Sequence, residues 1–408
     1  MESYRFYAGI DWADQAHFVS IRELGTERVE EKSFDHSGAG LGAMVEWLTK
    51  RARGRPEDVA VAIEVTRGAI VEALLERRFV VFAINPKQLD RFRDRHTAAG
   101  AKDDRRDAFV LLHSLSTDSH AFRQLNVDKP AVMRLREHAR MYEDLKHDLR
   151  RLTNQLRAQL HRYYPQILAL SSAADEPWIW DLIERAPLPE RAARTKQTSV
   201  ERLLRDHRIR RCSAADVVAV LKTPALPVAP GTAESARDHV MMLLPRIRLT
   251  RQQLDGVEVT LGRILDGMES AEAEIGGHHD VTIIRSWPGL GTIVSAMMLG
   301  EASIPLGARD YHRLRALCGV APVTRQSGKS RQVSMRHACN DRLRSAVHWW
   351  AGCAAVHDPR ARALYQSHKA RGHTHGRSIR AIADRLLRDL VVCLAKQEVY
   401  RPELRGVA

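Results

Sequence analysis

The sequence predicts an α/β domain at the N-terminus, long paired helices in the middle and a mainly helical C-terminal part. Over residues 4–115, apolar runs of strand length alternate with stretches that have helical periodicity. Two sustained heptad repeats of apolar residues follow, and the last part, 276–400, is helical in pattern with basic loops. We expect three domains, which span 1–128, 129–275 with a Pro- and Arg-rich insertion at 166–232, and 276–408.

The N-terminal domain is expected to contain four strands and three helices. A polar turn at 14–17 joins the first two strands, which predicts a hairpin, and Asn85-Pro86 ends the fourth strand with a turn signal. A mixed layer with carboxylates at its strand ends is typical of a ribonuclease-H-like sheet. The expected strands are Arg5–Ile10, Phe18–Glu23, Val59–Ile63 and Val80–Ile84, and the expected helices lie near Leu41–Lys50, Ala69–Glu76 and Asp104–Leu115.

Two heptad seams predict long helices that pair through their apolar stripes. Pro245 lies early in the second seam, where we expect a kink. The seams can pair within the chain or between subunits, and we slightly favour pairing between subunits. The seam positions are Leu135, Tyr142, Leu149, Leu156 and Tyr163 in the first repeat, and Val240, Ile247, Leu254 and Leu261 in the second.

The segment between the seams, 166–232, is expected to form a small helical insertion or an extended connector. Trp178 and Trp180 flank Ile179 within it. These tryptophans could stack on nucleic-acid bases, but packing in an ordinary core is the favoured interpretation.

Charge favours a polyanionic partner. The chain has 64 Lys and Arg against 50 Asp and Glu, a net charge of +14, which favours phosphate contacts and counterion release on nucleic acid. The five cysteines are scattered, and none form a Cys-x-x-Cys pair, which argues against disulfides or a zinc site and fits a reducing cytoplasm. We expect no membrane span, because no long apolar run is present, and no signal peptide, because the first five residues lead directly into a predicted strand.

Four carboxylates are the strongest chemical signal. Asp11 and Glu64 each end an apolar run, and Asp104 and Asp107 lie three apart at the start of a predicted helix. Acids at strand ends and on one helix face can converge. Divalent metal is the usual means of neutralising such a cluster, and two metals can clamp the oxygens of a phosphodiester. Alternatively, acids at a helix start simply stabilise its dipole, and Asp103 could replace Asp104 on the same face.

Ser327 is the candidate nucleophile of a second cluster, which also contains Arg325, Lys329 and Arg331. A serine hydroxyl needs activation, guanidinium groups can stabilise charge on phosphoryl oxygens, and Gly328 lets the backbone approach DNA. Taken alone, the segment is more simply a basic phosphate-binding loop. A Walker A loop is rejected, because Val323 stands where that motif requires Gly and no strand–loop–helix context is expected.

Two further motifs are less specific. Pro288-Gly-Leu-Gly291 precedes an apolar stretch, as in helix-hairpin-helix turns, where backbone N–H groups meet a phosphate; Gly289 and Gly291 are therefore candidate contacts. A tight turn before a buried helix would use the same residues. His373 and His375 suggest a metal pair, but a polar loop facing nucleic acid is favoured.

Taken together, these residues resemble the DEDD transposases of insertion sequences, a family of bridge-RNA-guided recombinases. The resemblance spans nearly the whole chain, is weakest at 166–232, and selects Asp104 rather than Asp103 as the family acid. Asp14 and Asp103 differ from the common family pattern, but neither position is one of the metal ligands that the resemblance implies. The matching motifs are Gly9–Asp11, Glu64–Gly68, Asn85-Pro86, Lys102–Ala108, Pro288–Gly291, Leu317–Pro322, Gln326–Lys329, and Arg371-Gly372 with the helix Ser378–Leu390.

The resemblance implies a concrete function. A RuvC-like domain would bind Mg²⁺, or alternatively Mn²⁺, through Asp11, Glu64, Asp104 and Asp107. Ser327 would attack DNA and form a 5′-phosphoserine link. A coiled coil would assemble a dimer or tetramer in which catalytic domains meet between subunits. Double-stranded donor and target DNA and an element-encoded guide RNA would be the partners, in a bacterial cytoplasm at the nucleoid.

Two other functions stay open at this point. The chain could be a metal-dependent junction-resolving nuclease, in which water attacks and Ser327 only binds phosphate. It could also be a non-catalytic coiled-coil protein that binds nucleic acid and carries a decayed nuclease domain. The intact carboxylate quartet argues against decay.

Overall fold

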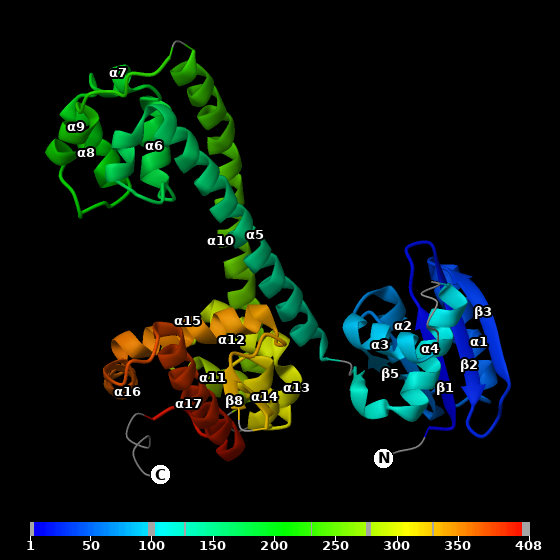
Figure 1. Ribbon diagram of the computed structural model, residues 1–408. Coiled ribbons are helices and arrows are strands. Elements are labelled where there is room, and N and C mark those ends of the chain that lie inside the picture. Colours follow the sequence, from blue (N-terminus) through cyan, green and yellow to red (C-terminus); the bar gives the residue numbers. More distant parts are fainter. Residues whose placement is uncertain are drawn as a thin grey trace. The chain divides into compact units, whose positions relative to one another are not determined.

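The computed structural model describes residues 4–96, 103–125, 128–229, 231–274, 279–328 and 330–401 (Figure 1). The chain divides into two compact units, Met1–Asp128 and Lys129–Ala408. Among the helices of the described ranges, none is both long enough and apolar enough to span a membrane.

A six-stranded sheet forms the centre of the N-terminal unit, in the order β3-β2-β1-β4-β5-β6. β1 pairs antiparallel with β2 and parallel with β4, so the predicted hairpin is confirmed. β5 is parallel to β4, and β6 is antiparallel to β5. The strands are β1 (Phe6–Asp11), β2 (Ala16–Glu23), β3 (Val29–Asp35), β4 (Val59–Ile63), β5 (Val80–Ala83) and β6 (Arg123–Gln124).

Helices cover both faces of this sheet. One hydrophobic core lies between one face of the sheet and the helices α1 (Gly38–Arg51) and α2 (Ala69–Glu76). Another lies between the opposite face and the helices α3 (Pro86–His96) and α4 (Asp104–Thr117). Two short 3₁₀ turns, Pro56–Asp58 and Ser119–Ala121, complete the unit.

The sequence prediction missed β3, β6 and α3. β3 is an edge strand in which only Phe34 is buried, and β6 has two exposed residues, so neither has the apolar alternation of a half-buried strand. Asn85-Pro86, a predicted turn, instead begins α3: Pro86 is the first residue of the helix, and the Asn85 side chain accepts a hydrogen bond from the Lys87 N–H at 2.9 Å.

The second unit contains two long helices, α5 (Pro130–Tyr163) and α10 (Thr232–Ala273), which pack side by side (Figure 1). Most of their seam positions are buried within one chain; Leu156 and Leu261, for example, are both 0 % exposed, whereas Tyr142 and Leu149 are partly buried. The two seams therefore bury each other within one chain, and our slight preference for their pairing between subunits is wrong. α10 continues through Pro245 as one helix.

The segment between these helices is a helical cap, so the predicted small helical insertion is confirmed. It consists of a 3₁₀ turn (Pro165–Ala169), α6 (Pro177–Arg185), α7 (Pro189–Ala192), α8 (Gln197–Asp206) and α9 (Ala214–Leu221). Trp178 and Trp180 are each 1 % exposed in its core. Their indole N–H groups donate to Glu176 and to the Ala174 carbonyl. Core packing is therefore confirmed, and base stacking by these tryptophans is wrong.

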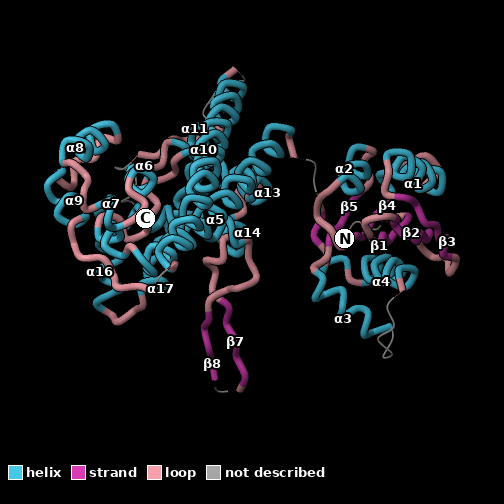
Figure 2. Tube along the Cα trace, turned by 90° about the horizontal axis from the view of Figure 1, so that it is seen from above, coloured by secondary structure: helices cyan, strands magenta, loops and turns pink. Residues whose placement is uncertain are grey.

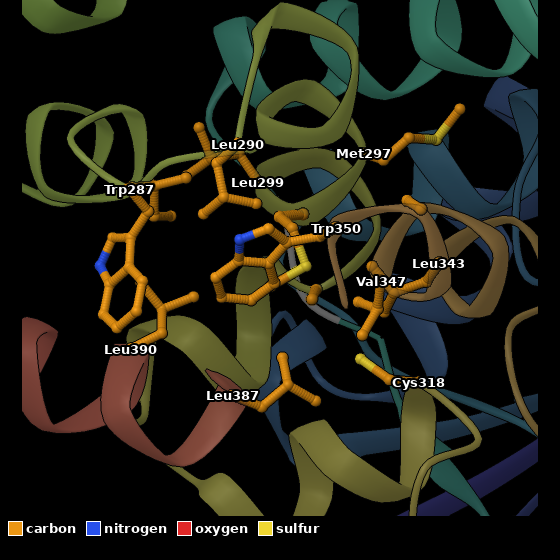
Figure 3. Close-up of a cluster of buried hydrophobic side chains, with 14 of the residues drawn as sticks. Trp287, Leu290, Met297, Leu299, Cys318, Leu343, Val347, Trp350, Leu387 and Leu390 are labelled. Atoms are coloured by element: carbon orange, nitrogen blue, oxygen red, sulfur yellow. The ribbon is translucent and has the colours of Figure 1, made fainter. Parts of the chain in front are cut away.

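The rest of the second unit is mainly helical around one core, in which Trp287 and Trp350 pack with leucines from several helices (Figure 3). The helices are α11 (Asp280–Arg285), α12 (Thr292–Glu301), α13 (Ser303–Gly307), α14 (Tyr311–Leu317), α15 (Asp341–His357), α16 (Pro359–Ala370) and α17 (His375–Lys396). One hairpin, β7 (Val323–Ser327) and β8 (Ser330–Ser334), projects from this core (Figure 2).

Candidate catalytic residues

Strand pairing places two of the four carboxylates side by side. Asp11 is the last residue of β1, and Glu64 directly follows β4. The parallel register pairs Ile10 with Ile63. Asp11 and Glu64 directly follow these paired residues, so they lie beside each other at the same edge of the sheet. Both side chains are half-buried.

The other two carboxylates start α4, which packs against β1. Asp104 is the first residue of this helix and is exposed, whereas Asp107, one turn later, is only 2 % exposed. Asp103 is the N-cap residue, and its side chain accepts a hydrogen bond from the Arg105 N–H. Gly9 lets α4 approach closely, because a Cβ at this position would lie 2.0 Å from the Ala108 carbonyl oxygen.

The electrostatics of Asp11 show that the four carboxylates interact. Burial raises the pKa of Asp11 to about 6, and the negative charges of Asp107, Asp104 and Glu64 add to the increase. Arg93 opposes the increase. Bringing these acids together therefore costs free energy that a bound cation would recover.

Arg93 is a member of this site that the sequence did not reveal. From α3, its guanidinium donates to both carboxylate oxygens of Asp107, at 2.8 and 2.9 Å, and to Asp90 at 2.7 Å. It therefore neutralises the most buried acid of the quartet. The local sequence does not distinguish Arg93 from Arg91 or Arg95 as the partner of Asp107. Only the packing of α3 on α4 places Arg93 beside this carboxylate.

The donor chemistry of the quartet fits a hard divalent cation, because all four side chains offer carboxylate oxygens. Their mutual repulsion at Asp11 supports the same fit. Within the described ranges, however, no three acidic, His or Cys side chains are already arranged as a metal site, and Asp107 is engaged by Arg93. Metal binding would require Asp107 to turn away from Arg93 or to bind through one free lone pair.

Ser327 lies at the end of the exposed hairpin and not in an irregular loop, which corrects the sequence prediction. It is the last residue of β7 and pairs with Ser330, and Gly328 begins the two-residue connection with φ +53°. Glycine adopts that left-handed backbone conformation with the least strain. The absence of a strand–loop–helix arrangement around this segment agrees with rejection of a Walker A loop.

The hairpin register also corrects the expected cluster of cations around the serine. Side chains alternate between the two faces of a strand, so Arg325 shares a face with Ser327. Arg331 pairs with Gln326 and therefore lies on the opposite face. Lys329 lies outside the described residues. In the part of the chain that is described, no group makes a hydrogen bond to the Ser327 hydroxyl, so the described residues of the hairpin place no general base on it.

Packing accounts for the Gly289–Gly291 turn. Gly289 has φ +85°, and a Cβ there would come within 3.0 Å of the Trp350 ring. The Trp350 indole N–H donates to the Pro288 carbonyl at 3.0 Å, and Gly291 is the N-cap residue of α12. A tight turn before a partly buried helix is thus sufficient to explain both glycines, and their contact with phosphate stays a prediction.

His373 and His375 do not form a metal pair with each other. The His373 Nδ1 atom lies 3.1 Å from Nδ1 of His368, whereas His375 meets the Tyr365 hydroxyl at 2.8 Å. This agrees with the favoured interpretation of a polar segment.

Comparison with known proteins identifies the family. Residues 8–165 match a family model described as a transposase, that of the IS110 DEDD type, and residues 281–366 match the model "Transposase IS116/IS110/IS902 family". The "Mini-circle putative transposase for IS117" of Streptomyces coelicolor is 30 % identical over 422 residues, which cover 100 % of this chain and 99 % of the relative. The chain belongs to the IS116/IS110/IS902 transposase family.

Two other relatives agree with this assignment. The "Putative transposase y4uE" of Sinorhizobium fredii is 46 % identical over 209 residues, which cover 51 % of this chain and 58 % of that relative. The "Insertion element IS116 uncharacterized 44.8 kDa protein" of Streptomyces clavuligerus is 25 % identical over 407 residues, which cover 98 % of this chain and 96 % of the relative. Transposition of an insertion sequence implies DNA as substrate, and the carboxylate quartet and Ser327 both lie inside the matched segments of this transposase.

Replacing Arg93 with alanine is expected to destabilise the metal-free transposase by about 3 kcal/mol, because the buried carboxylate of Asp107 loses its counter-charge. Mg²⁺ should restore most of the loss, since a bound cation takes the place of the guanidinium. Thermal unfolding of the full chain with EDTA and with excess Mg²⁺ measures both effects. Arg91→Ala, an exposed change on the same helix, is the matched control. If Arg93→Ala were equally destabilised with and without Mg²⁺, the Mg²⁺ ion would not take the place of the Arg93 guanidinium beside Asp107.

Proposed function

We propose that this transposase cuts and rejoins DNA through a covalent 5′-phosphoserine intermediate at Ser327, aided by divalent metal at the carboxylate quartet. The observation that carries the proposal is the placement of Ser327 beside a glycine turn at the exposed end of a projecting hairpin. A nucleophile there can reach a phosphodiester without moving the helical core. Charge on the phosphoryl oxygens would be stabilised by a centre elsewhere in the assembly.

We further propose that the N-terminal unit has a ribonuclease-H-like, RuvC-like fold. The support is its strand order, with β3, β2 and β1 antiparallel and β4 and β5 parallel to β1. The carboxylates at the ends of β1 and β4 and on α4 then occupy the edge where parallel strands end. Asp11, Glu64, Asp104 and Asp107 would hold Mg²⁺ or Mn²⁺, which would stabilise charge on the phosphoryl oxygens.

The chemical step conserves the energy of the phosphodiester. The Ser327 hydroxyl loses its proton and attacks phosphorus, a Ser–O–P bond forms, and the bond to the 3′ oxygen breaks. The departing 3′ oxygen takes up a proton. Religation reverses these steps with a different 3′ hydroxyl, so no external energy source is required. Arg325, on the same face as Ser327, would bind the non-bridging oxygens, and Arg331 and Lys329 would contact neighbouring phosphates.

The proposal extends to the assembly. Domains 1–128, 129–275 and 276–408 would divide metal binding, assembly and nucleophilic attack among them, in a homo-oligomer guided by an element-encoded RNA in the bacterial cytoplasm. In this proposal, the carboxylates that complete the Ser327 site would come from another subunit. Mixing Ser327→Ala and Asp11→Ala subunits should then restore strand exchange that neither variant performs alone. Failure of complementation would argue for a site within one subunit.

The decisive experiment traps the intermediate. The transposase is incubated with nicked or gapped DNA of its own element, together with copurifying RNA, and then denatured. A DNA adduct that maps to Ser327 by mass spectrometry supports the proposal. Clean DNA cleavage without an adduct would support the rival metal nuclease, in which water attacks. Sequencing of the copurifying RNA tests guidance, because a single structured species is expected and random cellular RNA would contradict it.

A further inference from the structure

A basic pocket of about 540 Å³ lies at the foot of the Ser327 hairpin. α5, α15 and α17 form its walls, and Val320 and Met335, which flank the two strands of the hairpin, line it as well. All of these elements belong to the second unit. The pocket contains none of the residues assigned to catalysis above.

Lysine and arginine supply four cations to the lining, of which Lys146 and Arg344 have carboxylate partners, and three histidines lie beside them. Lys146, His147 and Arg150 come from α5, Arg344 and His348 from α15, and His375 and Arg380 from α17. The one carboxylate among these described lining residues is Glu143, which already pairs with Lys146 at 3.1 Å. Neither Arg150 nor Arg380 has a carboxylate partner among the residues that the structure describes, and the one polar contact of Arg380 is with the Met335 sulfur at 3.3 Å.

The electrostatic effect of these cations is visible at His348. Burial lowers the pKa of His348, and the positive charges of His375 and Arg380 lower it further. Positive charge is therefore disfavoured at His348. An anion could instead be bound by Arg150 and Arg380, which have no carboxylate partner among the described residues.

An exposed aromatic ring completes the pocket. Trp349 is 63 % exposed, although its neighbour Trp350 is completely buried in the core. A tryptophan that lines a basic pocket without packing into the core offers a face on which a base can stack, while nearby cations hold the phosphates. Such a combination fits an unpaired nucleotide better than a duplex, whose base faces are already stacked.

The pocket opens into a shallow groove along α5. His147 and Arg150 line both, and the groove continues over Arg151, Asn154, Gln155 and Ala158. The groove is lined by basic side chains, so a strand that leaves the pocket would meet further groups that bind a phosphodiester backbone.

We propose that this pocket binds an unpaired nucleotide of the substrate DNA, with its base on Trp349 and its phosphates on Arg150 and Arg380. DNA is favoured over RNA because each strand of the hairpin has five residues and therefore spans about 17 Å, so the pocket lies within one short DNA segment of Ser327. The choice of DNA rests on the proposed attack of Ser327 on DNA. The pocket would hold a strand that has been released from its duplex near the exchange point.

Binding of a fluorescently labelled oligothymidylate to the full-length transposase, measured by anisotropy, tests this proposal. Trp349→Ala is expected to weaken binding about tenfold, and Trp349→Phe should retain most of the affinity because phenylalanine still stacks. Arg150→Gln and Arg380→Gln should each lower the affinity and reduce the slope of log K against log salt by about 1. Arg202→Gln, an exposed change on α8 in the helical cap, is the matched control and should have little effect.

Several results would overturn the proposal. Trp349→Ala could bind like the wild type, or Trp349→Phe could lose as much affinity as Trp349→Ala. Duplex DNA could compete as well as the single strand, which would remove the need for an unpaired base. An oligouridylate could bind more tightly with the same dependence on Trp349, which would assign the pocket to RNA. A change in oligomeric state in Trp349→Ala, with unchanged DNA affinity, would assign it to a protein contact.

The same assay separates this inference from the proposed chemistry. Ser327→Ala should bind the oligothymidylate with unchanged affinity, because Ser327 lies at the other end of the hairpin. If no adduct forms at Ser327 but binding depends on Trp349, the chemistry fails and the pocket stands. If the adduct forms but Trp349 has no effect on binding, the pocket fails and the chemistry stands.

Discussion

Ser327→Ala is expected to abolish strand exchange and the covalent adduct, with a loss of at least about 10⁴-fold, as is usual when a nucleophile is removed. Folding should be unchanged. The side chain is exposed at the end of β7, so the substitution creates no cavity and leaves no buried polar group unpaired. Exchange assays on element DNA and thermal unfolding of the same preparations measure both expectations.

Ser330→Ala provides a matched control that the hairpin itself supplies. Ser330 is exposed and pairs directly with Ser327, so the two substitutions remove the same hydroxyl from equivalent surroundings. Ser330→Ala should retain most activity. If both variants lost activity equally, the hydroxyls would serve to bind phosphate, and the covalent mechanism would be wrong.

Gly9→Ala is expected to have the largest effect on the N-terminal unit. The added Cβ would lie 2.0 Å from the Ala108 carbonyl oxygen and 2.6 Å from the Leu112 backbone nitrogen, both on α4. Backbone atoms cannot rotate away, so α4 must move from β1. We expect a destabilisation of about 3 kcal/mol or more, at the upper end of the cost of overpacking.

The same displacement should impair catalysis in the molecules that remain folded. α4 carries Asp104 and Asp107, whereas Asp11 ends β1, so separation of these two elements pulls the quartet apart. A shift of about 1 Å can cost 100-fold in rate. Denaturant unfolding and strand exchange at a temperature where the variant is folded provide the two measurements.

Gly42→Ala tests whether the effect of Gly9→Ala is steric. Gly42 lies in α1, and a Cβ there would meet nothing within 4 Å. Helix propensity then predicts stabilisation by about 0.5–1 kcal/mol. If Gly9→Ala were equally harmless, the close approach of β1 and α4 would not be a constraint on the fold.

Elements with a strong internal pattern could be predicted from the sequence. β1, β4 and β5 are short apolar runs, and the two long helices carry heptads, so each reveals its structure through its own residues. β3 and α3 could not be found in this way. β3 is a polar edge strand held by its pairing with β2, and α3 is a polar helix that is stabilised by packing on α4.

The same distinction between local pattern and tertiary packing applies to the residues of the candidate site. Asp11 and Glu64 were found because an acid that ends an apolar strand is a local signal. Arg93 was missed, because its role depends on a contact with Asp107, fourteen residues away, that only the packing of two helices creates. The cations near Ser327 were judged by proximity in sequence, whereas pairing of β7 with β8 places Arg325 and Arg331 on opposite faces.

The sequence by itself determined the family, through its similarity to known transposases. Residue type and local periodicity predicted the α/β and helical parts and indicated the residues to which the proposed chemistry is assigned. Only the tertiary structure decided three further points: the heptad seams bury each other within one chain, Arg93 neutralises Asp107, and Ser327 lies on a hairpin above a basic pocket that contains Trp349. The physical reason is common to all three. Burial, counter-charge and shared faces are properties of pairs of segments, and pairing is fixed by the packing of the whole unit.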